Sequence, residues 1–172
     1  MRNDYASAWM PYSAPRKTII TAAGDTERFM YFVLEGIQKG YYLVDDKAHV
    51  VAFTYAPSFS GIPESFFRQA PSNAYLETIE DSRFLRISYT TQQEMLARHP
   101  ELETLFRKAA EFFIVGFLER YFQRMAFPIR ERFSAFMKRS PHLLNKIPHK
   151  DLASYLRIDA TNFSKLLAEV RI

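Results

Sequence analysis

Hydroxyl, amino and methyl groups gather on one face of the segment ATNFSKLLAE, which begins at Ala160 near the end of the chain. At helical spacing, Thr161, Ser164 and Lys165 share this face with the small residues Ala160 and Ala168. Hydroxyl and amino groups form hydrogen bonds to base edges and phosphate oxygens, and small neighbours let a helix enter the major groove. The face therefore predicts contact with double-stranded DNA.

Two further residues complete the predicted DNA-contacting set. Asn162 lies nearer the start of the same segment, where an amide can bond a phosphate oxygen. Lys150 lies in the preceding segment HKDLASYLR, residues 149–157. Together the two segments predict a helix-turn-helix, and an ordinary helical hairpin is the alternative that the pattern leaves open.

The inner faces of these two segments are apolar, as a helix-turn-helix requires. Ala153 supplies the small residue that lets the second helix cross close above the first. The inward positions are Leu152, Leu156, Ile158, Phe163 and Leu166. The turn holds Arg157 where glycine is common, and an arginine adopts a positive φ there at a cost of about 1 kcal/mol.

The positive charge of the chain is concentrated in the same region. Residues 127–172 contain nine Lys and Arg and four Asp and Glu, a net charge of +5, whereas residues 1–126 carry −1. A concentrated basic region is typical of proteins that bind the phosphate backbone, although basic ends occur on many other proteins. The charge supports the DNA prediction without establishing it.

Residues that could perform catalysis are few. The chain contains no cysteine, which excludes disulfides and thiolate chemistry. An enzyme in a cupin-like β-barrel would need two or three histidines and a glutamate on adjacent strands, and only His49 lies in the region predicted as β. We therefore predict no enzymatic activity, no catalytic residue and no metal or haem site. The histidines, predicted as scattered surface residues, are His49, His99, His142 and His149.

The segments before the predicted DNA-contacting helices alternate short apolar runs with turns. This pattern over residues 28–90 predicts an antiparallel sandwich or barrel. The runs are RFMYFVLEG (28–36), QKGYYLVDD (38–46), AHVVAFTYAP (48–57), NAYLETIED (73–81) and SRFLRISY (82–89), with a turn at Asp45–Lys47. Between them, Pro57–Ser72 contains three prolines and a glycine and predicts a loop with at most one helical turn.

Helical periodicity begins near Thr90. A helix over residues 90–99 is expected to start with a threonine cap and to stop before Pro100, and a long helix follows over 101–127. Shorter helices are predicted over 129–140, 149–157 and 160–170. The long helix is apolar over much of its circumference, so we expect one of its faces to be buried against a partner chain. A central helix in a monomeric core is the alternative. The residues predicted to pair are Phe106, Phe113, Phe117 and Tyr121.

Membrane insertion and export are not indicated by the sequence. The longest uncharged apolar run, Phe112–Leu118, is far shorter than the roughly 20 residues that a membrane span needs. The first 15 residues lack a hydrophobic secretory core. We expect a cytoplasmic protein without a membrane partner.

These pieces, in this order, resemble the Crp/Fnr family of bacterial transcription regulators. The resemblance rests on MYFVLEGIQKGYYLVDDKAHVVAF (30–53) and on IPHKDLASYLRIDATNFSKL (147–166). It implies an α+β fold with a jelly-roll-like antiparallel β-roll over 1–100, a long dimerisation helix over 101–127, and a helix-turn-helix domain over 128–172. It also implies a homodimer that reads a two-fold-related DNA site, with RNA polymerase as a further candidate partner. Because the chain ends at Ile172, directly after the recognition helix, we expect a winged-helix-like domain that lacks most of the wing.

Nucleotide-binding members of this family carry a cassette with a Gly-Glu pair and an arginine followed by a small hydroxyl residue. The corresponding region here is GIPESFFRQAPSNAYLE, in which Pro71–Ala74 stand where the arginine is expected. A buried phosphate without a guanidinium partner is poorly compensated, so the pattern argues against cyclic AMP and predicts no cofactor. The alternative is a cyclic-nucleotide-responsive regulator with a non-standard phosphate site at Arg68 or backbone amides. The candidate pocket residues are Gly61, Glu64, Arg68, Ser72 and Asn73.

Overall fold

The computed structural model describes residues 2–169. The chain divides into two compact units, residues 1–105 and residues 106–172, and the boundary falls inside a long helix. The three-part division into residues 1–100, 101–127 and 128–172 stays a prediction.

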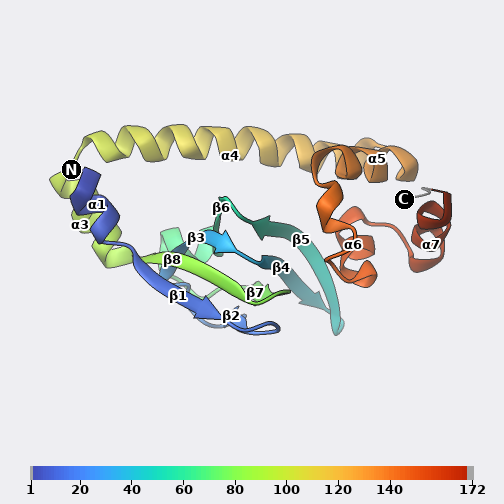
Figure 1. Cartoon of the computed structure of the whole chain (residues 1–172), viewed down its shortest axis with the longest axis horizontal. Coiled ribbons are helices and arrows are strands. Elements are labelled where there is room, and N and C mark those ends of the chain that lie inside the picture. The colour runs from blue at the N-terminus through green and yellow to red at the C-terminus, as the bar shows by residue number, and fades with distance from the viewer. Residues whose placement is uncertain (1, 170–172) are drawn as a thin grey trace. The chain divides into compact units, whose positions relative to one another are not determined.

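The first unit is built on two four-stranded antiparallel sheets, ordered β1-β8-β3-β6 and β2-β7-β4-β5 (Figure 1). The α+β class and the antiparallel β-roll expected from the sequence are thus confirmed. The strands are β1 (Met10–Ala14), β2 (Ile19–Thr21), β3 (Phe29–Glu35), β4 (Ile37–Val44), β5 (Lys47–Tyr55), β6 (Ser58–Ser60), β7 (Tyr75–Thr78) and β8 (Ser82–Ser88). The core of this unit contains five strand residues together with Ile62 and Ala74 from the connections; the strand residues are Ala14, Tyr31, Val33, Leu76 and Phe84.

Two tight connections set the register of these strands. Asp45 and Asp46 have φ of 49° and 59°, the pair of positive values that a two-residue hairpin between β4 and β5 requires. Gly36, between β3 and β4, has a φ of 87°, and a Cβ there would lie 2.6 Å from the carbonyl oxygen of Asp81. Only glycine fits at position 36, which explains why the sequence Leu34-Glu35 is followed by glycine.

The structure corrects the prediction for residues 57–72 and for the start of the chain. The predicted loop contains β6 and a six-residue helix, α2 (Pro63–Arg68), which exceeds one helical turn. Pro63 presets the first helical position, and burial of Phe66 holds the helix against the roll. Strands β1 and β2 and the helix α1 (Arg2–Ser7) precede the region predicted as β.

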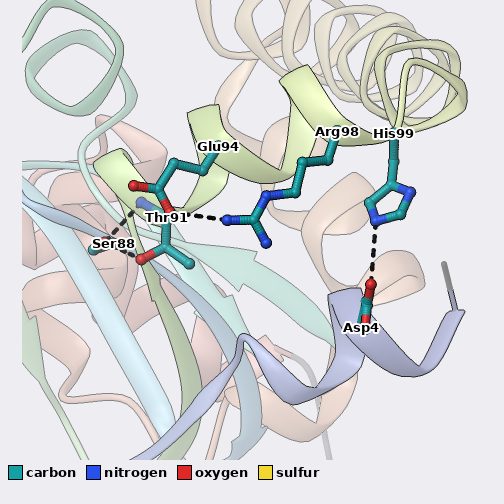
Figure 2. Close-up of polar contacts among 6 residues, drawn as sticks. All are labelled: Asp4, Ser88, Thr91, Glu94, Arg98 and His99. Atoms are coloured by element: carbon teal, nitrogen blue, oxygen red, sulfur yellow. Dashed lines mark hydrogen bonds and ion pairs between the residues drawn. The ribbon is translucent and has the colours of Figure 1, made fainter.

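Helix α3 (Tyr89–Arg98) follows the roll, and Ser88 caps its N-terminus by accepting a hydrogen bond from the Thr91 backbone N–H at 3.1 Å. The expected threonine cap is therefore wrong by two residues. At the other end of α3, His99 lies 3.5 Å from the Asp4 carboxylate of α1 (Figure 2). His99 is thus half-buried between elements, contrary to its prediction as a surface residue.

Four of the five predicted helices that follow Thr90 lie within one residue of their expected bounds, and the last is described up to Glu169. They are α3, α4 (Glu101–Ala126), α5 (Ile129–Arg139), α6 (His149–Leu156) and α7 (Ala160–Glu169). A short 3-10 helix, η1 (Pro141–Leu143), lies between α5 and α6 and was not predicted. Val170 and the chain end at Ile172, on which the wing prediction depends, lie outside the described residues. None of the helices described is long and apolar enough to cross a membrane.

Candidate nucleic-acid interface and ligand cassette

Helices α6 and α7 pack through the apolar positions that the sequence indicated. Leu152, Leu156, Ile158, Phe163 and Leu166 are all buried, as is the small residue Ala153. The ring of Phe163 also meets the edge of Phe133 from α5, with ring centroids 6.0 Å apart. Burying these side chains stabilises the pair by roughly 1.5–3 kcal/mol for each large residue and fixes how α7 is presented.

The opposite face of α7 is exposed. Ala160, Thr161, Ser164, Lys165 and Ala168 all lie on the surface. The Ser164 hydroxyl donates to the Ala160 carbonyl at 2.9 Å, which leaves its lone pairs as acceptors. The arrangement presents a narrow helical surface of small and hydrogen-bonding groups, which can approach the floor of a groove. Lys150, in the first turn of α6, is also exposed.

Asn162 lies in the first turn of α7, as the sequence indicated, and its contact with a phosphate stays a prediction. Its side-chain amide donates to one carboxylate oxygen of Asp159 at 2.6 Å, and its backbone N–H donates to the other at 2.9 Å. These bonds to the carboxylate hold the pKa of Asp159 below its usual value. Asp159 thus caps the N-terminus of α7, and Asn162 takes part in that cap.

The turn between α6 and α7 is left-handed at Arg157, whose φ is 55° and ψ is 46°. In this conformation the backbone N–H of Arg157 donates to the Ser154 carbonyl at 3.0 Å, and that of Ile158 donates to Ala153 at 2.9 Å. Both bonds satisfy carbonyls at the C-terminus of α6. The arginine therefore adopts the conformation that the turn demands, at the backbone cost expected from the sequence.

We expect Arg157→Gly to be more stable than Arg157→Ala by about 1 kcal/mol. Both changes remove the same side chain, so their difference reports the left-handed backbone alone. Chemical denaturation followed by circular dichroism measures both free energies of unfolding. An alanine variant as stable as the glycine variant would contradict the left-handed turn.

Helix α4 carries an exposed aromatic ladder, which we define as Phe113, Phe117 and Tyr121. Their rings stack in sequence, with centroids 6.2 Å and 6.3 Å apart and interplanar angles of 18° and 20°. The three side chains are between 41% and 54% exposed, and Phe106 on the same face is half-buried. A row of parallel rings on one side of a helix offers a flat apolar surface.

The cassette residues do not converge on one point. Glu64 and Arg68 lie exposed at opposite ends of α2, and Asn73 is also exposed. Ser72 is buried, but its hydroxyl donates to the Ala74 carbonyl and accepts from the Ala74 N–H, both at 2.9 Å. Gly61 is half-buried, with a φ of 142°. Of the five candidates, only Ser72 is buried, and its hydroxyl is already bonded within its own loop.

A carboxylate that the sequence analysis did not single out lies buried beside this loop. Glu27 is 2% exposed, and its carboxylate accepts hydrogen bonds from the Thr21 hydroxyl at 2.7 Å and the Phe29 N–H at 3.2 Å. Its own backbone N–H donates to Ser65 of α2 at 2.9 Å. Burial raises the pKa of the Glu27 carboxyl. Glu27 therefore joins α2 to the roll through its backbone N–H, while its carboxyl group is buried against Thr21 and Phe29.

Arg86 on β8 is a second charged residue that the sequence analysis missed. Its guanidinium lies 4.3 Å from the centroids of both the Tyr12 and Phe29 rings. Arg86 shares its side of β8 with the core residue Phe84, two positions earlier in the strand. No group of three or more metal-ligating side chains occurs within residues 2–169.

The fold is shared with solved regulators of the Crp/Fnr type. FixK2 from Bradyrhizobium japonicum superposes with a TM-score of 0.81 at 14% identity, over 94% of this chain and 84% of FixK2. The c-di-GMP-responsive global regulator CLP of Xanthomonas campestris gives a TM-score of 0.71 at 15% identity, over 99% of this chain and 90% of CLP. CooA from Carboxydothermus hydrogenoformans gives 0.70 at 16% identity, over 96% and 77%. At these identities the likeness defines the fold class.

The sequence profile of the cyclic nucleotide-binding domain matches residues 12–99, half of the chain. The protein belongs to the cyclic nucleotide-binding domain family. No curated protein matches the sequence.

Proposed function

We propose that this protein is a dimeric, sequence-specific DNA-binding transcription regulator without enzymatic activity. The observation that carries the proposal is the exposed face of α7, where Thr161, Ser164 and Lys165 lie opposite a fully buried apolar stripe. These groups match the donors and acceptors of base edges and phosphates. Lys150 adds a phosphate contact, and the Asp159–Asn162 cap holds the start of the helix.

The aromatic ladder of α4 supports a homodimer. Three stacked rings, each more than two-fifths exposed, form an apolar strip that a second copy of the same helix can cover. Such pairing would present two copies of α7 related by a two-fold axis. Two-fold symmetry in the protein implies a palindromic operator.

Selection of bound sequences from random duplex DNA tests this function. We expect a palindrome whose half-sites lie about one helical turn, or roughly 10 base pairs, apart. Recovery of no enriched sequence, with binding equal for all duplexes, would contradict sequence-specific regulation.

A cyclic-nucleotide-responsive regulator is the second candidate function, favoured by the family match over residues 12–99. The cassette argues against it, because Arg68 is exposed and the Ser72 hydroxyl is bonded within its loop. We therefore propose that the roll does not respond to cyclic AMP.

We expect isothermal titration calorimetry with cyclic AMP and cyclic GMP to show no binding with a dissociation constant below about 1 mM. This limit corresponds to a binding free energy of roughly −4 kcal/mol. The absence of a guanidinium within Pro71–Ala74 is the physical reason. The variant Ser72→Arg, which places a guanidinium within that segment, provides the comparison. Submillimolar binding by the unchanged protein would establish the second candidate function instead.

A further inference from the structure

Two arginines of the second unit contact Tyr155, and two more contact Arg124 or its neighbour Met125. Arg124 of α4 lies over the face of the Tyr155 ring, 5.0 Å from its centroid, and Arg139 of α5 donates to the Tyr155 hydroxyl at 3.5 Å. Arg132 donates to the Arg124 carbonyl at 3.4 Å. The fourth, Arg157 in the α6–α7 turn, contacts the Sδ of Met125, the residue next to Arg124, at 2.8 Å. We call Arg124, Arg132, Arg139 and Arg157 the arginine cluster.

The members of the cluster act on one another electrostatically. Burial, together with the neighbouring guanidinium groups of Arg120, Arg157 and Arg139, holds the pKa of Arg124 below its usual value. Burial and Arg157 lower the pKa of Arg132 in the same way. Neighbouring guanidinium groups create a positive local potential, and this potential disfavours the charged form of each group.

Two other arginines of this unit lie beside a carboxylate. Arg107 pairs with Glu111, and Arg130 pairs with Glu169. Among residues 2–169, no ion pair joins a carboxylate to Arg132, Arg139 or Arg157. The Nε atom of Arg132 is buried and has no hydrogen-bond partner among residues 2–169. Within the described part of the chain, Arg132, Arg139 and Arg157 thus bring three guanidinium groups into one region without a carboxylate paired to any of them.

We propose that the arginine cluster is a phosphate-binding site. Guanidinium groups present several N–H donors in a planar fork that suits the oxygens of a phosphate. Arg139 and Arg157 are exposed, so an anion can reach the cluster from solvent, while Arg124 and Arg132 are partly buried and supply positive potential behind it. The phosphate belongs either to the DNA backbone or to a small phosphorylated ligand.

Pyrophosphate is the probe for the site itself. At 10 mM pyrophosphate and constant ionic strength adjusted with sodium chloride, we expect the Tm of the full chain to rise by roughly 3–6 °C. The double variant Arg139→Gln/Arg157→Asn should lose this rise, because asparagine tolerates the left-handed turn while the charge is removed. The matched control is Lys108→Gln/Lys138→Gln, which removes two exposed charges of the same unit and should keep the rise.

The salt dependence of DNA binding then identifies the source of the phosphate. If the cluster contacts the DNA backbone, the double variant should reduce the slope of log K against log salt by about 0.9 for each lost contact. An unchanged slope with a lost Tm rise assigns the site to a small phosphorylated ligand. A wild-type chain without a Tm rise, or a rise retained by the double variant, would overturn the proposal.

The DNA measurement rests on the proposed function, whereas the pyrophosphate measurement does not. A chain that binds no DNA but shows the pyrophosphate effect would refute the proposed function and leave the phosphate site intact. The opposite result would refute the phosphate site alone.

Discussion

The double change Thr161→Ala/Lys165→Ala is expected to weaken binding to the selected operator by about 10³-fold. Each specific contact at a base edge or phosphate contributes roughly 1–3 kcal/mol, and a dimer loses the same contacts in both half-sites. Both side chains lie on the exposed face of α7, so the fold should be unaffected. Fluorescence anisotropy with the selected duplex measures the change.

The chain supplies a matched control for this experiment. Thr104 and Lys108 of α4 have the same spacing as Thr161 and Lys165, and both are exposed. Thr104→Ala/Lys108→Ala removes the same groups and the same charge from a different helix and should leave operator affinity within about twofold. If both double variants lost operator affinity equally, or if neither lost it, α7 would not be the recognition helix.

Phe117→Asp is expected to convert the proposed dimer to a monomer, with a dissociation constant raised by at least about 10³-fold. Removing a buried phenylalanine costs about 3–5 kcal/mol, and the aspartates of both protomers would be buried near the symmetry axis. Sedimentation equilibrium measures the dissociation constant. Because Phe117 is the middle ring of the aromatic ladder, the change also interrupts both stacks.

Val115→Asp is the control for the dimer prediction. Val115 is 67% exposed and lies about half a turn of helix away from Phe117, so the same charge is placed outside the aromatic ladder. We expect this variant to remain dimeric. A Phe117→Asp chain that still dimerises, or a Val115→Asp chain that does not, would show that another face of α4 pairs.

Elements with strong local patterns could be predicted from the sequence, whereas elements that depend on a neighbour could not. Helix α4 has no breaker before Pro128, and β4 and β5 are joined by a turn with its own signature. Strand β1, with the sequence MPYSA, has neither alternation nor β-branched residues. It is a strand because it pairs with β8 from Met10↔Arg86 to Ala14↔Ser82.

The candidate sites divide in the same way. The exposed face of α7 follows from helical periodicity, because Phe163 and Leu166 at inward spacing leave the opposite side to Thr161 and Lys165. Charged residues inside the roll are unpredictable from such patterns, since glutamate and arginine are normally exposed. Glu27 and Arg86 are accommodated by specific partners, a threonine hydroxyl and two aromatic rings, that only the folded chain brings together.

The burial of Glu27 has a thermodynamic consequence. Its carboxyl has a higher pKa in the folded roll than the ordinary value of 4.5 expected for the unfolded chain, because burial disfavours the charged form. Between pH 4.5 and the raised value, folding is therefore accompanied by proton uptake at this residue. Its contribution to the free energy of unfolding decreases as the pH rises through that window. Mild acid thus stabilises the roll through Glu27, the reverse of its effect on a salt-bridged carboxylate.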